Sequence, residues 1–245
     1  MKSSPESLID VRTHYCPGCG HGIAHRLLAE CMDELGVRER TIGVVPVGCA
    51  VLGYFYFNCD ISEAAHGRTV AVATGIKRVL PDRVVFSYQG DGDLAAIGMA
   101  ETVHAANRGE AVTVIFVNNS VYGMTGGQMA PTTLVGQKTS TCATDVGRDP
   151  ALMGPPIKVC ELLNTLDRPI HIERTALDGP AGVIKTRRAM MAALRAQVDH
   201  NGYGFVEILS PCPVYQRRTP EQALKFVGGD MTKTFPVRCF RKYSP

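Results

Sequence analysis

The sequence lacks the features that mark three large classes of protein. It contains no run of about 18 or more uncharged apolar residues, which a membrane-spanning helix needs. Its first residues hold no apolar core of the kind found in signal peptides, so we expect a cytoplasmic protein with no membrane partner. The formal net charge is only +3 and no long basic run occurs, so nucleic acid is not an expected partner.

An ordinary apolar content accompanies these absences. Hydrophobic residues make up 45% of the 245 positions and charged residues 20%, which excludes a disordered chain. The length is sufficient for one large domain or two small ones. Because no internal repeat, low-complexity linker or change of composition divides the chain, we expect residues 1–245 to form a single α/β domain.

The spacing of apolar residues predicts alternating strands and helices. The clearest unit is a strand at 84–88, an alanine-rich helix at 94–107 and a second apolar strand at 112–117. Continuous apolar strands on either side of a helix are typical of a mostly parallel sheet with helices on both faces. We expect further helices at 21–35, 67–79, 157–166 and 184–197, further strands at 41–47, 170–174 and 204–209, a polar arm at 1–15 that wraps over a surface, and a long loop at 122–149.

A turn rich in glycine and aspartate follows the strand at 84–88. In Gly90-Asp91-Gly92-Asp93 the glycines let the backbone approach a phosphate, and the N-terminus of the next helix favours anions. Ligands of open α/β sheets bind at this carboxyl edge. The Asp91 carboxylate would repel a bare phosphate, and a metal ion that bridges carboxylate and diphosphate resolves that conflict.

A second polar pair lies at the end of the next strand. Asn118 and Asn119 come one helix and one strand after Gly92. Amide, carboxylate and carbonyl oxygens are the ligands that Mg²⁺ prefers. Each turn alone is also typical of an ordinary connection between strand and helix, but the spacing of the two together favours a magnesium–diphosphate site.

Nine cysteines are many for a chain in a reducing compartment, where they would not form a disulfide framework. Cys16 and Cys19 share one tight turn, whereas Cys49 and Cys212 each follow a predicted strand. Four thiolates that converge at one end of a sheet hold either zinc or a 4Fe–4S cluster, and spacing does not choose between them. The other five are expected to be apolar filler or incidental thiols: Cys31, Cys59, Cys142, Cys160 and Cys239.

Five motifs occur in an order that resembles one enzyme family. They are YCPGCGHG at 15–22, VGCA at 47–50, HGR at 66–68, GDGD at 90–93 and YGMTGGQMAPTT at 122–133. The Gly-Asp-Gly and Asn-Asn pair resembles the thiamine diphosphate signature. The whole set resembles the β subunit of the 2-oxoacid:ferredoxin oxidoreductases. The resemblance implies a thiamine-diphosphate-binding fold with an N-terminal cysteine turn and a C-terminal extension, which holds thiamine diphosphate, Mg²⁺ and one 4Fe–4S cluster.

The resemblance also implies roles for individual residues. Asp91 and Asn119 match side-chain ligands of Mg²⁺, with the Val121 carbonyl as a third ligand. The cluster ligands match Cys16, Cys19, Cys49 and Cys212. No catalytic residue is fixed: His21 and His66 are candidates to contact cofactor or substrate, and a structural role is an equal alternative for each. The implied thiamine diphosphate contacts are Gly48, Cys49, Gly90, Asp91, Gly92, Asp93, Asn119, Val121, Gly123, Met124 and Thr125.

The family's active site is divided between subunits. The glutamate that activates the aminopyrimidine is implied to belong to an α subunit, because the one candidate here, Glu101, is interpreted as a solvated helical charge. The resemblance therefore implies an α subunit as partner and leaves room for γ and ferredoxin-like δ subunits. It also implies that ferredoxin accepts the electrons and that coenzyme A takes the acyl group.

The stretch after Cys49 bears on the substrate. Relatives that act on charged or small 2-oxoacids commonly carry Lys or Arg there, whereas this chain has Leu52 and no basic residue through Phe55. An unpaired carboxylate against an apolar wall is costly, while a branched side chain gains about 0.8 kcal/mol per buried CH₂. We therefore expect a branched-chain 2-oxoacid such as 2-oxoisovalerate, with 2-oxoglutarate as the alternative. Two other classes stay open: a non-oxidative thiamine diphosphate enzyme and a zinc-stabilised binding subunit.

Overall fold

Seven strands form one mixed sheet at the centre of the molecule. The computed structural model describes residues 4–142 and 146–244. The strand order is β2-β1-β3-β4-β8-β7-β9, and every neighbouring pair is parallel except β7 with β9. The bounds are β1 Thr41–Pro46, β2 Asp60–Ala64, β3 Val84–Gly90, β4 Thr113–Asn118, β7 His171–Ala176, β8 Gly204–Leu209 and β9 Arg238–Arg241.

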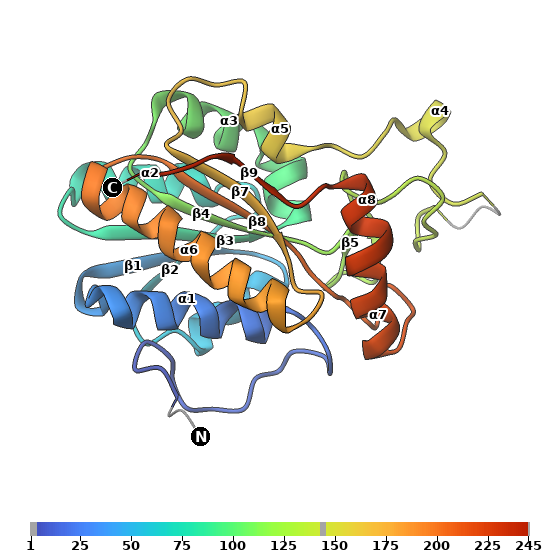
Figure 1. The fold of residues 1–245 in the computed structure, drawn as a ribbon, viewed down its shortest axis with the longest axis horizontal. Helices are drawn as coiled ribbons and strands as arrows, with labels where there is room; N and C mark the ends of the chain where they lie inside the picture. The colour runs from blue at the N-terminus through green and yellow to red at the C-terminus, as the bar shows by residue number, and fades with distance from the viewer. Residues whose placement is uncertain (1–3, 143–145, 245) are drawn as a thin grey trace.

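Helices cover both faces of this sheet, as the apolar strands predicted (Figure 1). Helices α1 (His21–Leu35) and α6 (Pro180–His200) pack on one face, where Leu28 and Met190 join a fully buried cluster. Helices α2 (Thr69–Val79), α3 (Met99–Arg108) and α5 (Val159–Leu163) pack on the other, around Phe116 and Phe205. No helix in the described ranges is long and apolar enough to cross a membrane.

The predicted helix at 94–107 is wrong in one respect. A π-helix spans Gly92–Ile97, and α3 starts only at Met99, so Gly98 separates two helical pieces. A Cβ at Gly98 would lie 2.5 Å from the carbonyl oxygen of Asp93, which only glycine avoids. π-Helical turns inside helices are frequent at functional sites, and this one carries the end of the Gly90–Asp93 turn.

The edge strands and the C-terminal elements were not predicted. Strand β2 carries the sequence DISEA with only Ala64 buried, and β9 is at most half-buried, so neither shows the apolar pattern of a core strand. The predicted loop at 122–149 contains a small hairpin, β5 (Val121–Tyr122) with β6 (Gln128–Met129). Additional short elements are η1 Arg38–Arg40, η2 Cys49–Phe55, α4 Pro150–Met153, α7 Pro220–Phe226, the π-helix Val227–Met231 and α8 Thr232–Thr234.

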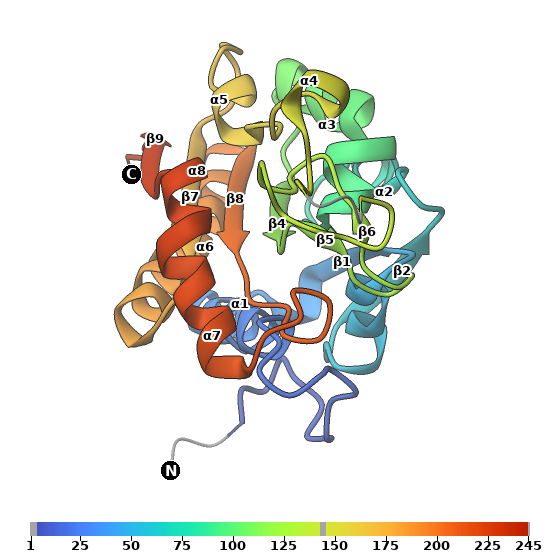
Figure 2. The same ribbon diagram turned by 90° about the vertical axis from the view of Figure 1, so that its right-hand side faces the viewer.

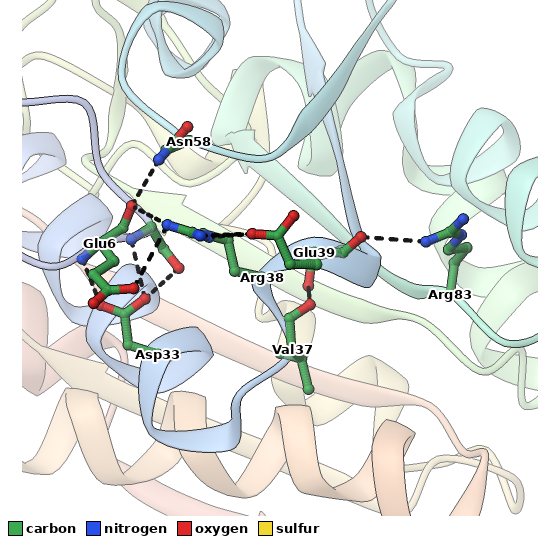
Figure 3. Close-up of polar contacts among 9 residues, drawn as sticks. Glu6, Asp33, Val37, Arg38, Glu39, Asn58 and Arg83 are labelled. Atoms are coloured by element: carbon green, nitrogen blue, oxygen red, sulfur yellow. Dashed lines mark hydrogen bonds and ion pairs between the residues drawn. The ribbon is translucent and has the colours of Figure 1, made fainter.

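The N-terminal arm lies along the outside of α1 and is fixed there by polar contacts (Figure 3). The Asp33 carboxylate accepts the backbone N–H of Glu6 at 2.7 Å and that of Ser7 at 3.0 Å. The Glu6 carbonyl accepts from the side chains of Asn58 (2.9 Å) and Arg38 (3.3 Å). The expectation that the arm wraps over a surface is confirmed for its described part, and the arm delivers the cysteine turn to the carboxyl edge of the sheet.

Candidate functional site

Four strand ends meet at the carboxyl edge of the sheet, which faces the viewer in Figure 2. Strands β1, β3, β4 and β8 end there in the turns that hold Cys49, Asp91, Asn119 and Cys212. A cavity of about 100 Å³ opens between these turns. Its lining contains every residue that the sequence nominated for contact with thiamine diphosphate or substrate, and adds Val47, Ala50 and Tyr122: the full lining is His21, Val47, Gly48, Cys49, Ala50, His66, Gly90, Asp91, Gly92, Asp93, Asn119, Val121, Tyr122, Gly123, Met124 and Thr125.

The Asp91 carboxylate is held between two turns. It is 3% exposed, and it accepts from the Thr132 hydroxyl at 3.0 Å and from the backbone N–H of Val121. Burial raises the pKa of Asp91 to about 7, against the opposing effect of these hydrogen bonds. A buried carboxylate with so few donors is suited to a cation. Thr132 lies in the 122–133 motif, but the motif alone gave no reason to single it out.

The turn after β4 presents Asn119 and Val121 to the same cavity. Ser120 lies at its tip with φ +63°, an uncommon conformation for a residue other than glycine. The Asn119 side-chain oxygen accepts the Val121 N–H at 3.3 Å, and the Asn119 carbonyl accepts from Gln216 at 3.0 Å. Asn118 points away from the cavity, since it does not line it and its amide is bonded to Glu207 and Ser120.

Glycine leaves room for a ligand backbone contact at two points. A Cβ at Gly48 or Gly90 would meet no atom within 4 Å, although both residues line the cavity. Gly48 also has φ +123°, which side-chain-bearing residues rarely adopt. Exposed backbone and hard oxygen donors together form a donor set that fits a magnesium–diphosphate group.

Asp93 serves a different purpose from Asp91. Its carboxylate accepts from the Gly67 N–H (2.5 Å), the Thr69 hydroxyl (2.9 Å) and the Gln89 amide (2.5 Å). The same carboxylate lies 3.4 Å from His66 Nδ1, which is 2.9 Å from the Val47 carbonyl oxygen. Asp93 therefore ties the His66–Arg68 turn to the end of β3 and holds His66 at the cavity. Glu101 lies outside the cavity and contacts Arg68.

His21 reaches the cavity from the first turn of α1. Its Nδ1 lies 2.7 Å from the Tyr88 hydroxyl, and Tyr15 stacks on its ring with centroids 4.9 Å apart. Burial lowers the pKa of His21 to about 4, so the imidazole is neutral at neutral pH. Its orientation is set by Tyr88 and Tyr15, neither of which the sequence singled out.

The four nominated cysteines converge beside the cavity. A Cβ at Gly123 would lie 3.3 Å from Cys49 Sγ and 3.7 Å from Cys212 Sγ. The thiols of Cys16 and Cys19 lie close enough to these to interact electrostatically, with Cys16 and Cys19 beside Cys49 and Cys19 beside Cys212. Convergence at one end of the sheet, which strand positions alone suggested, is therefore a property of the fold.

Backbone N–H groups point at three of these sulfurs. His21 N–H donates to Cys19, Met124 N–H to Cys49 and Tyr215 N–H to Cys212. Burial raises the pKa of Cys19 to about 11 and that of Cys212 to about 12, so both thiols are protonated at neutral pH until a metal displaces the protons. Hydrogen bonds to sulfur are a common device for tuning an iron–sulfur centre.

The spacing of the sulfurs is wider than a zinc site requires. Tetrahedral zinc with Zn–S bonds of about 2.3 Å places its sulfurs about 3.8 Å apart. Across residues 4–142 and 146–244, the only three His, Cys, Asp or Glu side chains with ligand atoms within 4.8 Å of one another are His171, Glu173 and Cys239. In that group the Tyr243 N–H donates to His171 Nδ1, which leaves the imidazole proton on Nε2 facing Glu173 rather than a lone pair for a metal.

The remaining cysteines lie away from the site. Cys31 and Cys160 are fully buried in the two core clusters, which agrees with their predicted role as apolar filler. Cys142 is buried at 2% exposure beside Met153, Cys59 is half-buried, and Cys239 lies exposed on β9.

Comparison with known proteins agrees with this geometry. Residues 53–208 match the family described as thiamine pyrophosphate enzyme, C-terminal TPP binding domain. The chain is 55% identical over 98% of its length to the ketoisovalerate oxidoreductase subunit VorA of Methanothermobacter thermautotrophicus. It is 34% identical over 87% of its length to the 2-oxoglutarate synthase subunit KorB of Methanocaldococcus jannaschii, of which it covers 76%. A solved 2-oxoglutarate:ferredoxin oxidoreductase from Magnetococcus marinus superimposes over 100% of this chain and 86% of its own with a TM-score of 0.80, at 22% identity.

Fold and site thus define a thiamine-diphosphate-binding α/β unit. Within that class, the chain belongs to the family of thiamine-diphosphate-binding subunits of the 2-oxoacid:ferredoxin oxidoreductases. It spans about half the length of the two ketoisovalerate oxidoreductase subunits that it matches, 52% of one and 48% of the other.

Proposed function

We propose that this chain is the catalytic β subunit of a 2-oxoacid:ferredoxin oxidoreductase that converts a branched-chain 2-oxoacid, coenzyme A and oxidised ferredoxin to acyl-CoA, CO₂ and reduced ferredoxin. The observation that carries the proposal is the meeting of two sites at one sheet edge. The Asp91–Asn119 donor set and the four cysteine thiols lie on either side of Gly123. In this proposal residues 1–245 act as one thiamine-diphosphate-binding unit with an N-terminal cysteine turn and a C-terminal extension.

The donor set supports Mg²⁺–thiamine diphosphate as the cofactor. Asp91 and Asn119 would bind the metal through side-chain oxygens and Val121 through its carbonyl, while Gly48 and Gly90 leave backbone open to the diphosphate. When bound, thiamine diphosphate supplies the carbanion that attacks the 2-oxo carbon and stabilises the charge left after CO₂ departs. His21, neutral and fixed by Tyr88, would contact cofactor or substrate as a hydrogen-bonding group rather than as a cation.

The cysteine spacing supports a 4Fe–4S cluster over zinc. Cys16, Cys19, Cys49 and Cys212 would ligate it, and Cys49 also lines the cofactor cavity. A redox centre beside the cofactor gives electrons a short path out of the site, which oxidative decarboxylation requires and non-oxidative chemistry does not. The zinc-stabilised subunit and the non-oxidative enzyme are therefore the less favoured alternatives.

The cavity is too small to be a complete site. Pockets for cofactor-sized ligands measure about 300–1,000 Å³, against about 100 Å³ here. No glutamate occurs among its lining residues in the described chain, so the group that activates the aminopyrimidine must come from elsewhere. Both observations support an α subunit that completes the site, with γ and ferredoxin-like δ subunits as further partners. The thiol chemistry and the ferredoxin acceptor support a reducing compartment, the cytoplasm.

The lining also supports an uncharged substrate side chain. It contains no lysine or arginine among the described residues. Leu52 lies half-buried in η2, directly after Ala50 of the cavity wall, and the neighbouring Tyr54 and Phe55 are each 43% exposed. This apolar shoulder favours 2-oxoisovalerate over 2-oxoglutarate unless the α subunit contributes a cation. The 55% identity to a ketoisovalerate oxidoreductase subunit agrees with that choice.

The decisive experiment uses the enzyme purified anaerobically with its partner subunits. We expect a broad absorption band near ~400 nm from the cluster and Mg²⁺-dependent binding of thiamine diphosphate by calorimetry. Asp91→Asn should abolish that binding, while Asp82→Asn, which removes an exposed carboxylate far from the cavity, should leave it intact. Colourless protein that contains zinc, or wild-type binding by Asp91→Asn, would contradict the proposal.

Substrate choice is tested on the same preparation. The ratio kcat/KM for 2-oxoisovalerate should exceed that for 2-oxoglutarate, with coenzyme A and a low-potential dye supplied. A tenfold preference for 2-oxoglutarate, which corresponds to about 1.4 kcal/mol in the transition state, would overturn the branched-chain assignment while leaving the family assignment intact.

A further inference from the structure

A fully buried ion pair lies in the sheet directly behind the proposed metal site. Arg174 on β7 and Glu207 on β8 are register partners, and both side chains are 0% exposed. Arg174 Nε lies 2.8 Å from Glu207 Oε2. Apolar residues of similar size often stabilise a core as well as a buried ion pair does. The retention of two charges here therefore calls for a role beyond packing.

The second oxygen of Glu207 gives that role. Glu207 Oε1 accepts from Asn118 Nδ2 at 2.8 Å. Asn118 is the last residue of β4; Phe116, two residues before it, is the register partner of Glu207, so all three side chains lie on one face of the sheet. The other end of the Asn118 amide, Oδ1, accepts the backbone N–H of Ser120 at 3.2 Å. One amide group thus connects Glu207 to the turn that carries Asn119 and Val121.

The direction of these two hydrogen bonds is fixed by charge. If the Asn118 amide turned over, its oxygen would face the Glu207 carboxylate and its NH₂ group would face the Ser120 N–H. Both contacts would be repulsive. An ionised Glu207 therefore holds the amide in the one orientation that closes the turn over Ser120, whose φ is +63°.

Arg174 keeps Glu207 ionised and is itself saturated from outside the sheet. Its two terminal nitrogens bind the Glu161 carboxylate of α5 at 2.9 and 2.5 Å. The C-terminal segment closes over the guanidinium, with the Pro236 carbonyl at 3.3 Å and the rings of Phe235 and Phe240 at 5.4 and 5.3 Å from its central carbon. The C-terminal segment is thus connected to the metal turn through Arg174, Glu207 and Asn118.

We propose that Glu207 is a positioning residue for the Mg²⁺–thiamine diphosphate site, which acts by fixing the Asn118 amide and through it the turn that carries Asn119 and Val121. This inference rests on the proposed function. It assigns Asn118 as a support of the site rather than a metal ligand, because both ends of its amide are engaged.

The test measures Mg²⁺ affinity at saturating thiamine diphosphate on the assembled enzyme, by calorimetry rather than activity. In Glu207→Gln the amide oxygen turns to Arg174, so an NH₂ group faces Asn118 and forces its amide over. We expect a 10- to 100-fold weaker apparent Mg²⁺ affinity, the range typical when a partner of a metal ligand is altered. Glu161→Gln is the matched control, because it removes a charge from the same arginine without touching Asn118, and its affinity should stay near wild type.

Rescue separates positioning from a general structural defect. In Glu207→Gln/Arg174→Met the glutamine oxygen is free to accept from Asn118, so Mg²⁺ affinity should recover although a second core residue has changed. If Glu207→Gln does not fold, Asn118→Ala takes its place and should show the same loss of affinity. Wild-type affinity in either variant, or a double variant weaker than the single, overturns the inference. Failure of the wild-type enzyme to bind Mg²⁺–thiamine diphosphate at all would instead refute the proposed function.

Discussion

Asp93 offers the sharpest test of how the cavity is built, because two substitutions there should have very different effects. The carboxylate joins three donors: the Gly67 N–H, the Thr69 hydroxyl and the Gln89 amide. Gln89 in turn accepts from the Ser87 hydroxyl at 2.9 Å. Burial raises the pKa of Asp93, so its negative charge is held at a cost.

In Asp93→Asn every one of these contacts can persist. The asparagine oxygen keeps the Gly67 N–H, and its NH₂ group donates to the Thr69 hydroxyl and to Gln89 once that amide turns over. The Ser87 hydroxyl then accepts instead of donating. Because the contacts reverse without being lost and the buried charge disappears, we expect the free energy of unfolding to change by no more than about 1 kcal/mol.

In Asp93→Ala the same three donors lose their acceptor inside the protein. Each buried group without a partner costs about 1–3 kcal/mol, so the free energy of unfolding should fall by about 3 kcal/mol or more. Urea denaturation followed by far-ultraviolet circular dichroism, with the slope compared between variants, measures both effects. Equal destabilisation by Asn and Ala would refute the reversible network, since it would show that the negative charge itself is needed.

The same pair of variants distinguishes a tie from a metal ligand. Asp93→Asn should bind Mg²⁺–thiamine diphosphate nearly as well as wild type, because the His66–Arg68 turn stays in place. A loss as complete as that of Asp91→Asn would mean that Asp93 contacts the metal directly.

Three further predictions concern the cysteines, acid stability and the buried ion pair. Cys212→Ser should lower the iron content and the visible absorption, whereas Cys31→Ser, in the core, should change neither; the reverse pattern would show that the ligand set is wrong. The His21 pKa of about 4 lies below the unfolded value of about 6.5, so its contribution is complete above pH 6.5 and is lost as pH falls. Unfolding free energies at pH 7 and 5 should therefore differ by about 2 kcal/mol more in wild type than in His21→Leu, and an equal difference would contradict the burial argument. Arg174→Met leaves Glu207 unpaired and should destabilise the chain by about 3–5 kcal/mol, with a smaller loss in Arg174→Met/Glu207→Gln; equal losses in a denaturation series would show that the charge is not the cause.

The sequence by itself determined the central strands and the catalytic edge. Strands β3, β4 and β8 are continuous apolar runs because both faces of each are covered, and that pattern is visible in any short window. The polar turns after them needed only the rule that parallel strands end together, which brought Asp91, Asn119, Cys49 and Cys212 to one place. Thirteen nominated residues line the cavity for that reason.

Other features were decided by partners far away in the chain. The helix after Gly92 breaks at Gly98 because its Cβ would meet the carbonyl of Asp93, and the edge strands β2 and β9 carry no apolar alternation that a window could detect. Asp93 looked like a cofactor contact but serves mainly to tie down the Gly67 turn, which lies 26 residues earlier.

The roles of the buried polar groups were visible only in three dimensions. Nothing in the sequence distinguishes Glu207 or Arg174 from a surface charge, and Asn118 is indistinguishable from its neighbour Asn119. Hydrophobic periodicity is a local property, because burial repeats along each element with the period of that element. The partner of a buried charge or amide is set by strand register and by segments that pack from a distance, so it is fixed only when the tertiary structure forms.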